Sequence, residues 1–132
     1  MNAESTLPEG LQPAIRVVAM PGDTNPAGDI FGGWIMSQVD LAGSIPAVER
    51  AGGRVVTVAV NHFEFHRPVF VGDVVSFYAE VSRVGRTSLT VEVQVYAQRY
   101  PDRRDCARVT EAVLTYVAVD DAGQPRSIPV VL

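Results

Sequence analysis

The chain has 132 residues, which is the length of one domain, and its formal net charge is −4. All 11 basic residues are arginine, and a chain without lysine has neither Schiff-base chemistry nor the lysine of a phosphate-binding loop. The negative charge excludes nucleic acid as the expected main partner. The single cysteine, Cys106, excludes an internal disulfide and a cysteine-rich metal site, and we expect it to serve in packing.

The first residues, 1–13, are polar and predict a flexible N-terminus followed by a single domain over residues 14–132. No basic and apolar leader is visible there, so we expect a cytoplasmic protein. Ile15–Met20 is rich in β-branched residues and predicts a strand. Residues 21–29 are a cluster of turn formers and predict a loop.

A long, mostly apolar stretch predicts a helix over Phe31–Arg50. Asp29 is the expected N-cap, and the glycine pair 52–53 is the expected stop. Pro46 lies inside and should weaken or kink the last turns. Glycine, serine, glutamine and aspartate interrupt the apolar run, which argues against a membrane span.

Four strand-like segments follow the helix, and the third alternates cleanly between apolar and polar residues. They are Arg54–Asn61, Val74–Val84, Thr87–Tyr100 and Cys106–Asp120. The order β-α-β-β-β-β predicts an α+β fold in which an antiparallel sheet wraps around one central helix and buries it on nearly all sides. One curved sheet leaves edges and faces uncovered, so we expect oligomerisation.

Asp40 is the only charged residue between Ile30 and Val48, and no cation lies three or four positions away on the predicted helix. A carboxylate in such surroundings indicates a functional role, and a structural role in bonding a loop amide is the alternative. Gly32 and Gly33 lie at the helix start, where free amides stabilise developing negative charge; tight helix packing is the equal alternative. Asp40 follows two turns later on the same face, so both groups are predicted to line one groove.

Two further segments carry polar groups suited to a ligand. Asn25, in the loop before the helix, has an amide that could orient water or a carbonyl, although taken alone it is better explained by turn chemistry. The hairpin residues Arg86, Thr87 and Ser88 offer a guanidinium and two hydroxyls for a phosphate, and a solvated arginine at a turn is the equal alternative.

His62, Glu64 and His66 alternate with two phenylalanines, which places the three polar side chains on one face of an extended chain. That spacing is compatible with metal ligands. The preferred interpretation is that the phenylalanines face the core and the polar residues face solvent, because no further histidine completes an imidazole-rich site. We therefore expect no metal.

The segment AMPGDTNPAGDIFGGWIMSQVD, Ala19–Asp40, resembles the hallmark of hotdog-fold acyl-CoA thioesterases of the YciA type. The similarity covers nearly the whole chain, from about Ile15 to Pro129. It continues through FHRPVFVGD at 65–73, GRTS at 85–88, TEAVLTYVAVD at 110–120 and GQPRSIP at 123–129.

The resemblance implies a hotdog fold that hydrolyses acyl-CoA to a free acid and CoA, without a metal or redox cofactor. It implies a homodimer with active sites at the subunit interface, commonly assembled as a trimer of dimers, that is, a hexamer. Asp40 matches the family's catalytic acid, and Asn25 matches the asparagine of an N-x-x-G-D loop. Gly32 and Gly33 match the helix start that binds the oxyanion. The region expected near the CoA arm is matched by Arg86, Thr87 and Ser88.

The chain departs from the family pattern at Pro46, at Asn61, where some relatives carry an acid, and in the polar residues His62, Glu64 and His66. Asp40 is predicted to act either as a general base on water or as a nucleophile that forms a transient anhydride. One alternative is a hotdog dehydratase or hydratase, which needs His62 to reach the Asp40 pocket. A second is a non-catalytic acyl-CoA sensor.

Overall fold

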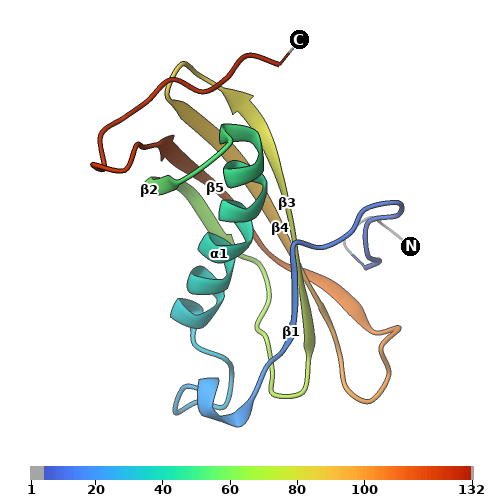
Figure 1. Cartoon of the computed structure of the whole chain (residues 1–132). Coiled ribbons are helices and arrows are strands. Elements are labelled where there is room, and N and C mark those ends of the chain that lie inside the picture. The colour runs from blue at the N-terminus through green and yellow to red at the C-terminus, as the bar shows by residue number, and fades with distance from the viewer. Residues whose placement is uncertain (1–4, 132) are drawn as a thin grey trace.

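In the computed structural model, which describes residues 5–131, one helix lies across one face of a five-stranded antiparallel sheet (Figure 1). The strand order is β1-β3-β4-β5-β2, so β1 and β2 form the two edges. The elements in chain order are β1 (Ile15–Val18), the 3-10 turn η1 (Pro21–Asp23), α1 (Gly32–Ala51), β2 (Val55–Phe65), β3 (Val74–Val84), β4 (Ser88–Gln98) and β5 (Cys106–Ala118). The predicted β-α-β-β-β-β order is confirmed.

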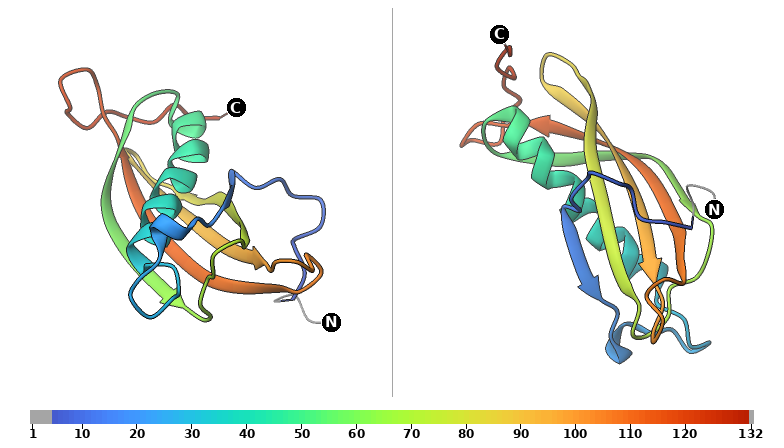
Figure 2. Two further views of the ribbon diagram at one scale, coloured as in Figure 1. Left: turned by 90° about the horizontal axis from the view of Figure 1, so that it is seen from below. Right: turned by 90° about the vertical axis from the view of Figure 1, so that its right-hand side faces the viewer.

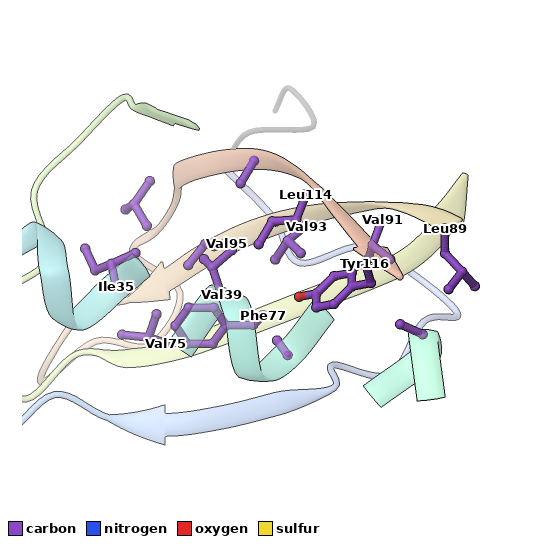
Figure 3. Packing of buried hydrophobic residues seen from close by; sticks show 14 of the residues in the cluster. Ile35, Val39, Val75, Phe77, Leu89, Val91, Val93, Val95, Leu114 and Tyr116 are labelled. Carbon is purple, nitrogen blue, oxygen red and sulfur yellow. The ribbon is translucent and has the colours of Figure 1, made fainter. Parts of the chain in front are cut away.

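The sheet curves around α1, as the two turned views show (Figure 2). Strand β4 is central, and its alternation works as predicted: every second residue points at the helix and is fully buried. These residues are Leu89, Val91, Val93, Val95 and Ala97. They meet Phe77 of β3 and Leu114 and Tyr116 of β5 in one core beneath the helix (Figure 3).

Only one face of α1 packs against this core. Its buried residues recur every three or four positions and are mostly small, which lets the helix lie close to the sheet. They are Ile35, Val39, Ala42, Gly43, Ala47 and Ala51. The prediction that the sheet buries the helix on nearly all sides is wrong for a single chain, because the other face leaves apolar side chains exposed. These are Met36, Leu41, Ile45 and Val48.

The helix begins differently from the prediction. Phe31, not Asp29, occupies the N-cap position, and no side chain in the described part of the chain caps the helix. Asp29 is held in the preceding loop instead, where its amide donates to Asn25 Oδ1 at 3.2 Å and its backbone bridges to Phe70. A residue whose backbone is held two positions before the cap is unable to bring its carboxylate onto the first-turn amides.

The helix ends as predicted. Gly52 has a φ of 72°, in the left-handed region that favours glycine, and its amide donates to the Val48 carbonyl at 2.9 Å. The helix runs without interruption through Pro46 to Ala51. Arg50 lies in the last turn, where a cation interacts favourably with the helix dipole.

Strand β2 is longer than predicted, since it continues past Asn61 to Phe65. Two register shifts, between Thr57 and Ala59 and between Val60 and His62, let it follow β5 around the bend of the sheet. Strand β3 matches its predicted range, whereas three strands end two residues earlier than predicted: β1 at Val18, β4 at Gln98 and β5 at Ala118.

The predicted flexible N-terminus falls partly on residues 1–4, which lie outside the described residues. From residue 5 onward the segment passes over the sheet face opposite the helix. There Pro8, Leu11 and Gln12 line a hollow together with Tyr78 and Glu80 of β3. In the described part of the chain, no helix has the length and apolar character needed to cross a membrane.

Candidate active site

Asp40 lies in the third turn of α1, half-buried between the helix and the sheet. Its carboxylate oxygen Oδ1 accepts a hydrogen bond from the Thr57 hydroxyl of β2 at 2.6 Å. The Tyr116 hydroxyl of β5 lies 3.2 Å from the same oxygen and 2.8 Å from the Asp40 backbone carbonyl. Two neutral hydroxyl donors on adjacent strands therefore fix the orientation of the carboxylate.

The Tyr116 hydroxyl is a permanent donor to Asp40, with its single proton shared between the backbone carbonyl and Oδ1. Its side chain is fully buried under the helix, with the hydroxyl oxygen turned toward α1 (Figure 3). Burial, and then the negative charge of Asp40, raise the pKa of the Tyr116 hydroxyl well above its ordinary value. The hydroxyl therefore keeps its proton at neutral pH.

Both hydroxyls contact Oδ1, and no residue from 5 to 131 donates a hydrogen bond to Oδ2 of Asp40. One oxygen is therefore used for positioning, and the other is left for water or a ligand. A carboxylate arranged in this way is suited to general-base or nucleophilic chemistry.

Gly43, one turn after Asp40, is required by the Tyr116 ring. A Cβ built on Gly43 would lie 2.5 Å from the Tyr116 hydroxyl oxygen and 3.3 Å from two ring carbons. At these separations a side chain at position 43 fits only if the Tyr116 side chain moves. The glycine therefore lets the hydroxyl reach the backbone and carboxylate of Asp40.

The first turn of α1 presents two free amides. The amides of Trp34 and Ile35 donate to the Phe31 carbonyl, whereas within residues 5–131 those of Gly32 and Gly33 have no backbone or side-chain acceptor. A Cβ on Gly33 would meet nothing within 4 Å, so its backbone is open to a ligand. A Cβ on Gly32 would lie 3.2 Å from the Phe65 ring, so close packing also explains that glycine.

Gly33 and Asp40 share one face of the helix, as predicted, but they are seven residues apart. At a rise of about 1.5 Å per residue, their backbones are separated by roughly 10 Å along the axis. A single thioester carbonyl is too small to contact the Gly33 amide and the Asp40 carboxylate of the same chain.

Asn25 lies at the Gly33 end of the helix, in the loop that precedes it. Its Oδ1 accepts hydrogen bonds from the amides of Ala27 at 2.9 Å and Asp29 at 3.2 Å. The turn chemistry considered for this residue is therefore present. Because these bonds occupy the carbonyl oxygen and fix the side chain, its NH₂ group is the part able to contact a ligand.

Arg86, Thr87 and Ser88 lie at the opposite end of the helix, in and after the turn that joins β3 to β4 (Figure 1). The Arg86 side chain is exposed, and its backbone carbonyl accepts from the Ile128 amide at 2.8 Å. Arg50 donates to the Pro129 carbonyl, which joins the C-terminal segment to the end of α1. The arginine predicted to contact phosphate is thus far from Gly33 within one chain.

His62 lies on the face of the sheet that points away from the helix. Its register partner on β5 is Val113, which faces outward, whereas Tyr116 faces Asp40 on the inner face. Its imidazole lies near the carboxylates of Glu64 and Glu111 instead. The hydratase alternative, which required His62 to reach Asp40, has no support within the described chain.

Sequence reasoning missed Thr57, Gly43 and Tyr116 as parts of the site. Tyr116 has the same strand parity as Leu114, which indicates that it faces the core. No local pattern shows which helix residue it meets, because 76 positions separate it from Asp40.

The profile of the thioesterase superfamily matches residues 27–100 of the chain. The acyl-CoA thioester hydrolase YciA of Escherichia coli strain K12 is 47% identical over 132 residues, covering 98% of this chain and 99% of the relative. A hexameric hotdog-fold thioesterase of Campylobacter jejuni is 50% identical, with a TM-score of 0.85 over 89% of this chain and 90% of that one. The predicted hotdog fold is confirmed by this likeness.

An acyl-CoA hydrolase of Staphylococcus aureus is more distant, at 32% identity with a TM-score of 0.80 over 87% of this chain and 70% of that one. Its structure has been solved with butyryl-CoA, CoA and CoA disulfide. Structures also exist of that hydrolase with an asparagine replaced by alanine, and with an aspartate fifteen positions further on replaced by alanine.

Proposed function

The chain belongs to the thioesterase superfamily, and from this membership and the geometry around Asp40 we propose that it hydrolyses acyl-CoA to a free carboxylic acid and CoA. The observation that carries the proposal is the half-buried Asp40 carboxylate. Its Oδ1 is held by Thr57 and Tyr116, while Oδ2 remains open. The YciA relatives that share this architecture are acyl-CoA thioester hydrolases.

Two routes are compatible with this carboxylate. As a general base, Oδ2 takes a proton from water while the water oxygen attacks the thioester carbon. As a nucleophile, Oδ2 attacks that carbon itself, CoA leaves as a thiolate, and water then hydrolyses the acyl-aspartate anhydride. In both routes the carbonyl oxygen becomes negative, and the free amide of Gly33 is the donor suited to stabilise it, with Gly32 beside it.

A two-fold dimer brings these groups together. If two α1 helices lie antiparallel, Gly33 of one chain faces Asp40 of the partner subunit, which removes the 10 Å separation found within one chain. The exposed apolar face of α1 and the free edge of β2, with Val58 and Val60 exposed, support this pairing. Hexameric relatives support further assembly of three such dimers.

Asn25 is proposed to orient the attacking water or the thioester carbonyl. The fifteen-residue spacing between Asn25 and Asp40 equals that between the asparagine and aspartate replaced in the Staphylococcus aureus hydrolase. The equal spacing supports, for this chain, a site that uses the same pair of residue types. The fixed loop geometry of Asn25 provides the rigidity that such orientation requires.

A release assay for free thiol over acyl-CoAs from short to long chains tests the proposed activity. We expect stoichiometric CoA release with at least one chain length. Hydration of enoyl-CoA without thiol release would instead identify a hydratase. Tight binding of CoA esters with neither reaction would identify a sensor.

The protein should not be a monomer in solution. Sedimentation velocity at micromolar concentration should give a mass of at least two chains, and six if dimers assemble in threes. Activity should sediment with the oligomer, because the site needs the partner subunit's Gly33. A folded, active species of 14.2 kDa would contradict both the assembly and the shared site.

Arg86 should contribute to CoA binding rather than to chemistry. Exposed charge pairs contribute at most about 1 kcal/mol, so Arg86→Ala should raise KM about two- to fivefold and leave kcat unchanged. The effect should shrink as salt increases, because exposed charges are screened. Arg104→Ala removes an exposed arginine from the β4–β5 connection and is the matched control. An unchanged KM for Arg86→Ala at low ionic strength would show the assignment to be wrong.

No metal or redox cofactor is proposed for hydrolysis, since Asp40 and the helix-start amides supply the groups that both routes require. Treatment with a chelator should therefore leave kcat unchanged. A loss of activity that only zinc or manganese restores would overturn this part of the proposal. We also propose a cytoplasmic location; the single free cysteine, Cys106, is compatible with a reducing compartment.

A further inference from the structure

Two histidines and two glutamates gather on the outer face of the sheet, away from the helix. His62 and Glu64 lie on β2, His66 follows directly after it, and Glu111 lies on β5. Glu64 and Glu111 are register partners, so their side chains leave the sheet on the same side. One potential ligand atom from each of His62, Glu64 and Glu111 falls within 4.8 Å of the other two.

The distances in this cluster fit an enclosed ion better than they fit direct hydrogen bonds. His62 Nε2 lies 3.7 Å from Glu64 Oε2 and 3.8 Å from Glu111 Oε1. His66 Nε2 lies 3.7 and 3.4 Å from the same two oxygens. All four distances exceed the range of about 2.7–3.2 Å for a normal N–H···O hydrogen bond. Ligand atoms about 2.0–2.1 Å from a tetrahedral zinc ion are roughly 3.3–3.4 Å apart, which is close to the separations of His62 from the two carboxylates.

The charges in the cluster also call for a cation. Two carboxylates directly opposite each other on neighbouring strands repel. The nearby Arg108 Nη1 lies 3.6 Å from the other oxygen of Glu111, Oε2.

Contrary to the expectation from the sequence, we propose that His62, Glu64 and Glu111 form a binding site for one divalent transition-metal ion of the zinc class, with His66 beside it. An imidazole nitrogen with two carboxylate oxygens suits Zn²⁺, whereas Mg²⁺ and Ca²⁺ prefer sites made of oxygen alone. The His62 and Glu64 side chains are about half exposed, so an ion can enter from solvent. Bound there, the ion would join the edge strand β2 to β5.

This site is separate from thioester hydrolysis. It lies on the outer face of the sheet, whereas Asp40 contacts Thr57 and Tyr116 on the inner face. Whether or not this site binds metal, the proposed hydrolysis is therefore unaffected. Metal binding is measured without substrate, so the two proposals are tested separately.

Equilibrium dialysis of the chelator-stripped, full-length protein against Zn²⁺ in millimolar Mg²⁺ tests the proposal. We expect one Zn²⁺ per chain and a melting temperature raised by at least about 3 °C at saturation. His62→Gln and Glu111→Gln should each weaken binding at least about tenfold, as loss of even an outer partner of a metal ligand often does. Glu92→Gln is the matched control, because it removes an exposed carboxylate of β4 on the same outer face of the sheet.

The Glu92→Gln control distinguishes a specific metal site from the general attraction of cations to an acidic surface. Equal weakening in Glu92→Gln and Glu111→Gln would overturn the proposal, as would binding unaffected by His62→Gln. Stoichiometry well below one ion per chain would also overturn it. Far-UV circular dichroism of each variant shows that its sheet is intact, so weaker binding reports ligand loss rather than unfolding.

Discussion

Replacing Asp40 by asparagine should lower kcat for acyl-CoA hydrolysis about 10²- to 10⁴-fold, the usual contribution of a general base. The substitution preserves size and keeps an oxygen at Oδ1 to accept from Thr57 and Tyr116, but it removes the basic oxygen at Oδ2. Affinity for acyl-CoA should change little, because binding is spread over the CoA arm and the acyl groove. Steady-state thiol release and ligand titration measure the two effects separately.

The same variant distinguishes catalysis from a structural role for Asp40. A half-buried carboxylate whose partners are neutral hydroxyls costs desolvation energy, so the melting temperature of Asp40→Asn should hold or rise. A structural role predicts the reverse, with a lower melting temperature and nearly intact kcat. Glu49→Gln, which neutralises an exposed carboxylate on the same helix, is the matched control. Near-normal turnover in folded Asp40→Asn would refute the mechanism.

Gly43→Ala should destabilise the protein by about 1–3 kcal/mol, the usual result of overpacking a core. Alanine normally stabilises a helix relative to glycine, so the sign of the change is itself informative. The new methyl group would lie 2.5 Å from the Tyr116 hydroxyl oxygen and must displace it from Asp40. Chemical denaturation measures the stability loss, and we expect a parallel fall in kcat as the carboxylate loses one of its two donors.

Tyr116→Phe provides the partner for a double-mutant cycle. Removing the hydroxyl relieves the shortest contact at Gly43, so adding Gly43→Ala to Tyr116→Phe should cost less stability than adding it to the native chain. Additive losses would show that Gly43 and Tyr116 are not coupled. Each variant's melting transition and kcat should be compared within one cycle.

Periodicity predicted the order of the elements, because an apolar helix and alternating strands carry their pattern locally. The alternation from Leu89 to Ala97 gave the buried face of β4 directly. The residues at which the helix and the strands begin and end were less predictable. Asp29 has the right residue type for a cap, but a bridge to Phe70, 41 positions away, holds its backbone in the loop. Two bulges carried β2 past Asn61, and bulges leave no clear periodic signal.

The candidate site was predictable only where it lies on one element. Asp40 stands out as a lone charge in an apolar helix, and the glycines at 32 and 33 stand out at its start. Thr57 and Tyr116 reach Asp40 through sheet pairing, which a sequence pattern leaves undefined. The roughly 10 Å between Gly33 and Asp40 follows from helix rise alone, although on the sequence alone their spacing predicted only that both groups line one groove.

The position of β2 at the sheet edge affects how the chain folds during synthesis. Among residues 5–131 its only partner in the sheet is β5, and translation completes β5 roughly 50 residues after β2. At about 5–20 residues per second, β2 waits some 3–10 s without its hydrogen-bonding strand. During that time a segment with apolar residues on its flank is available to strands of neighbouring nascent chains. We therefore expect slower translation or crowded polysomes to favour misassembly through β2, which offers 11 residues for pairing, whereas the other edge strand, β1, offers four.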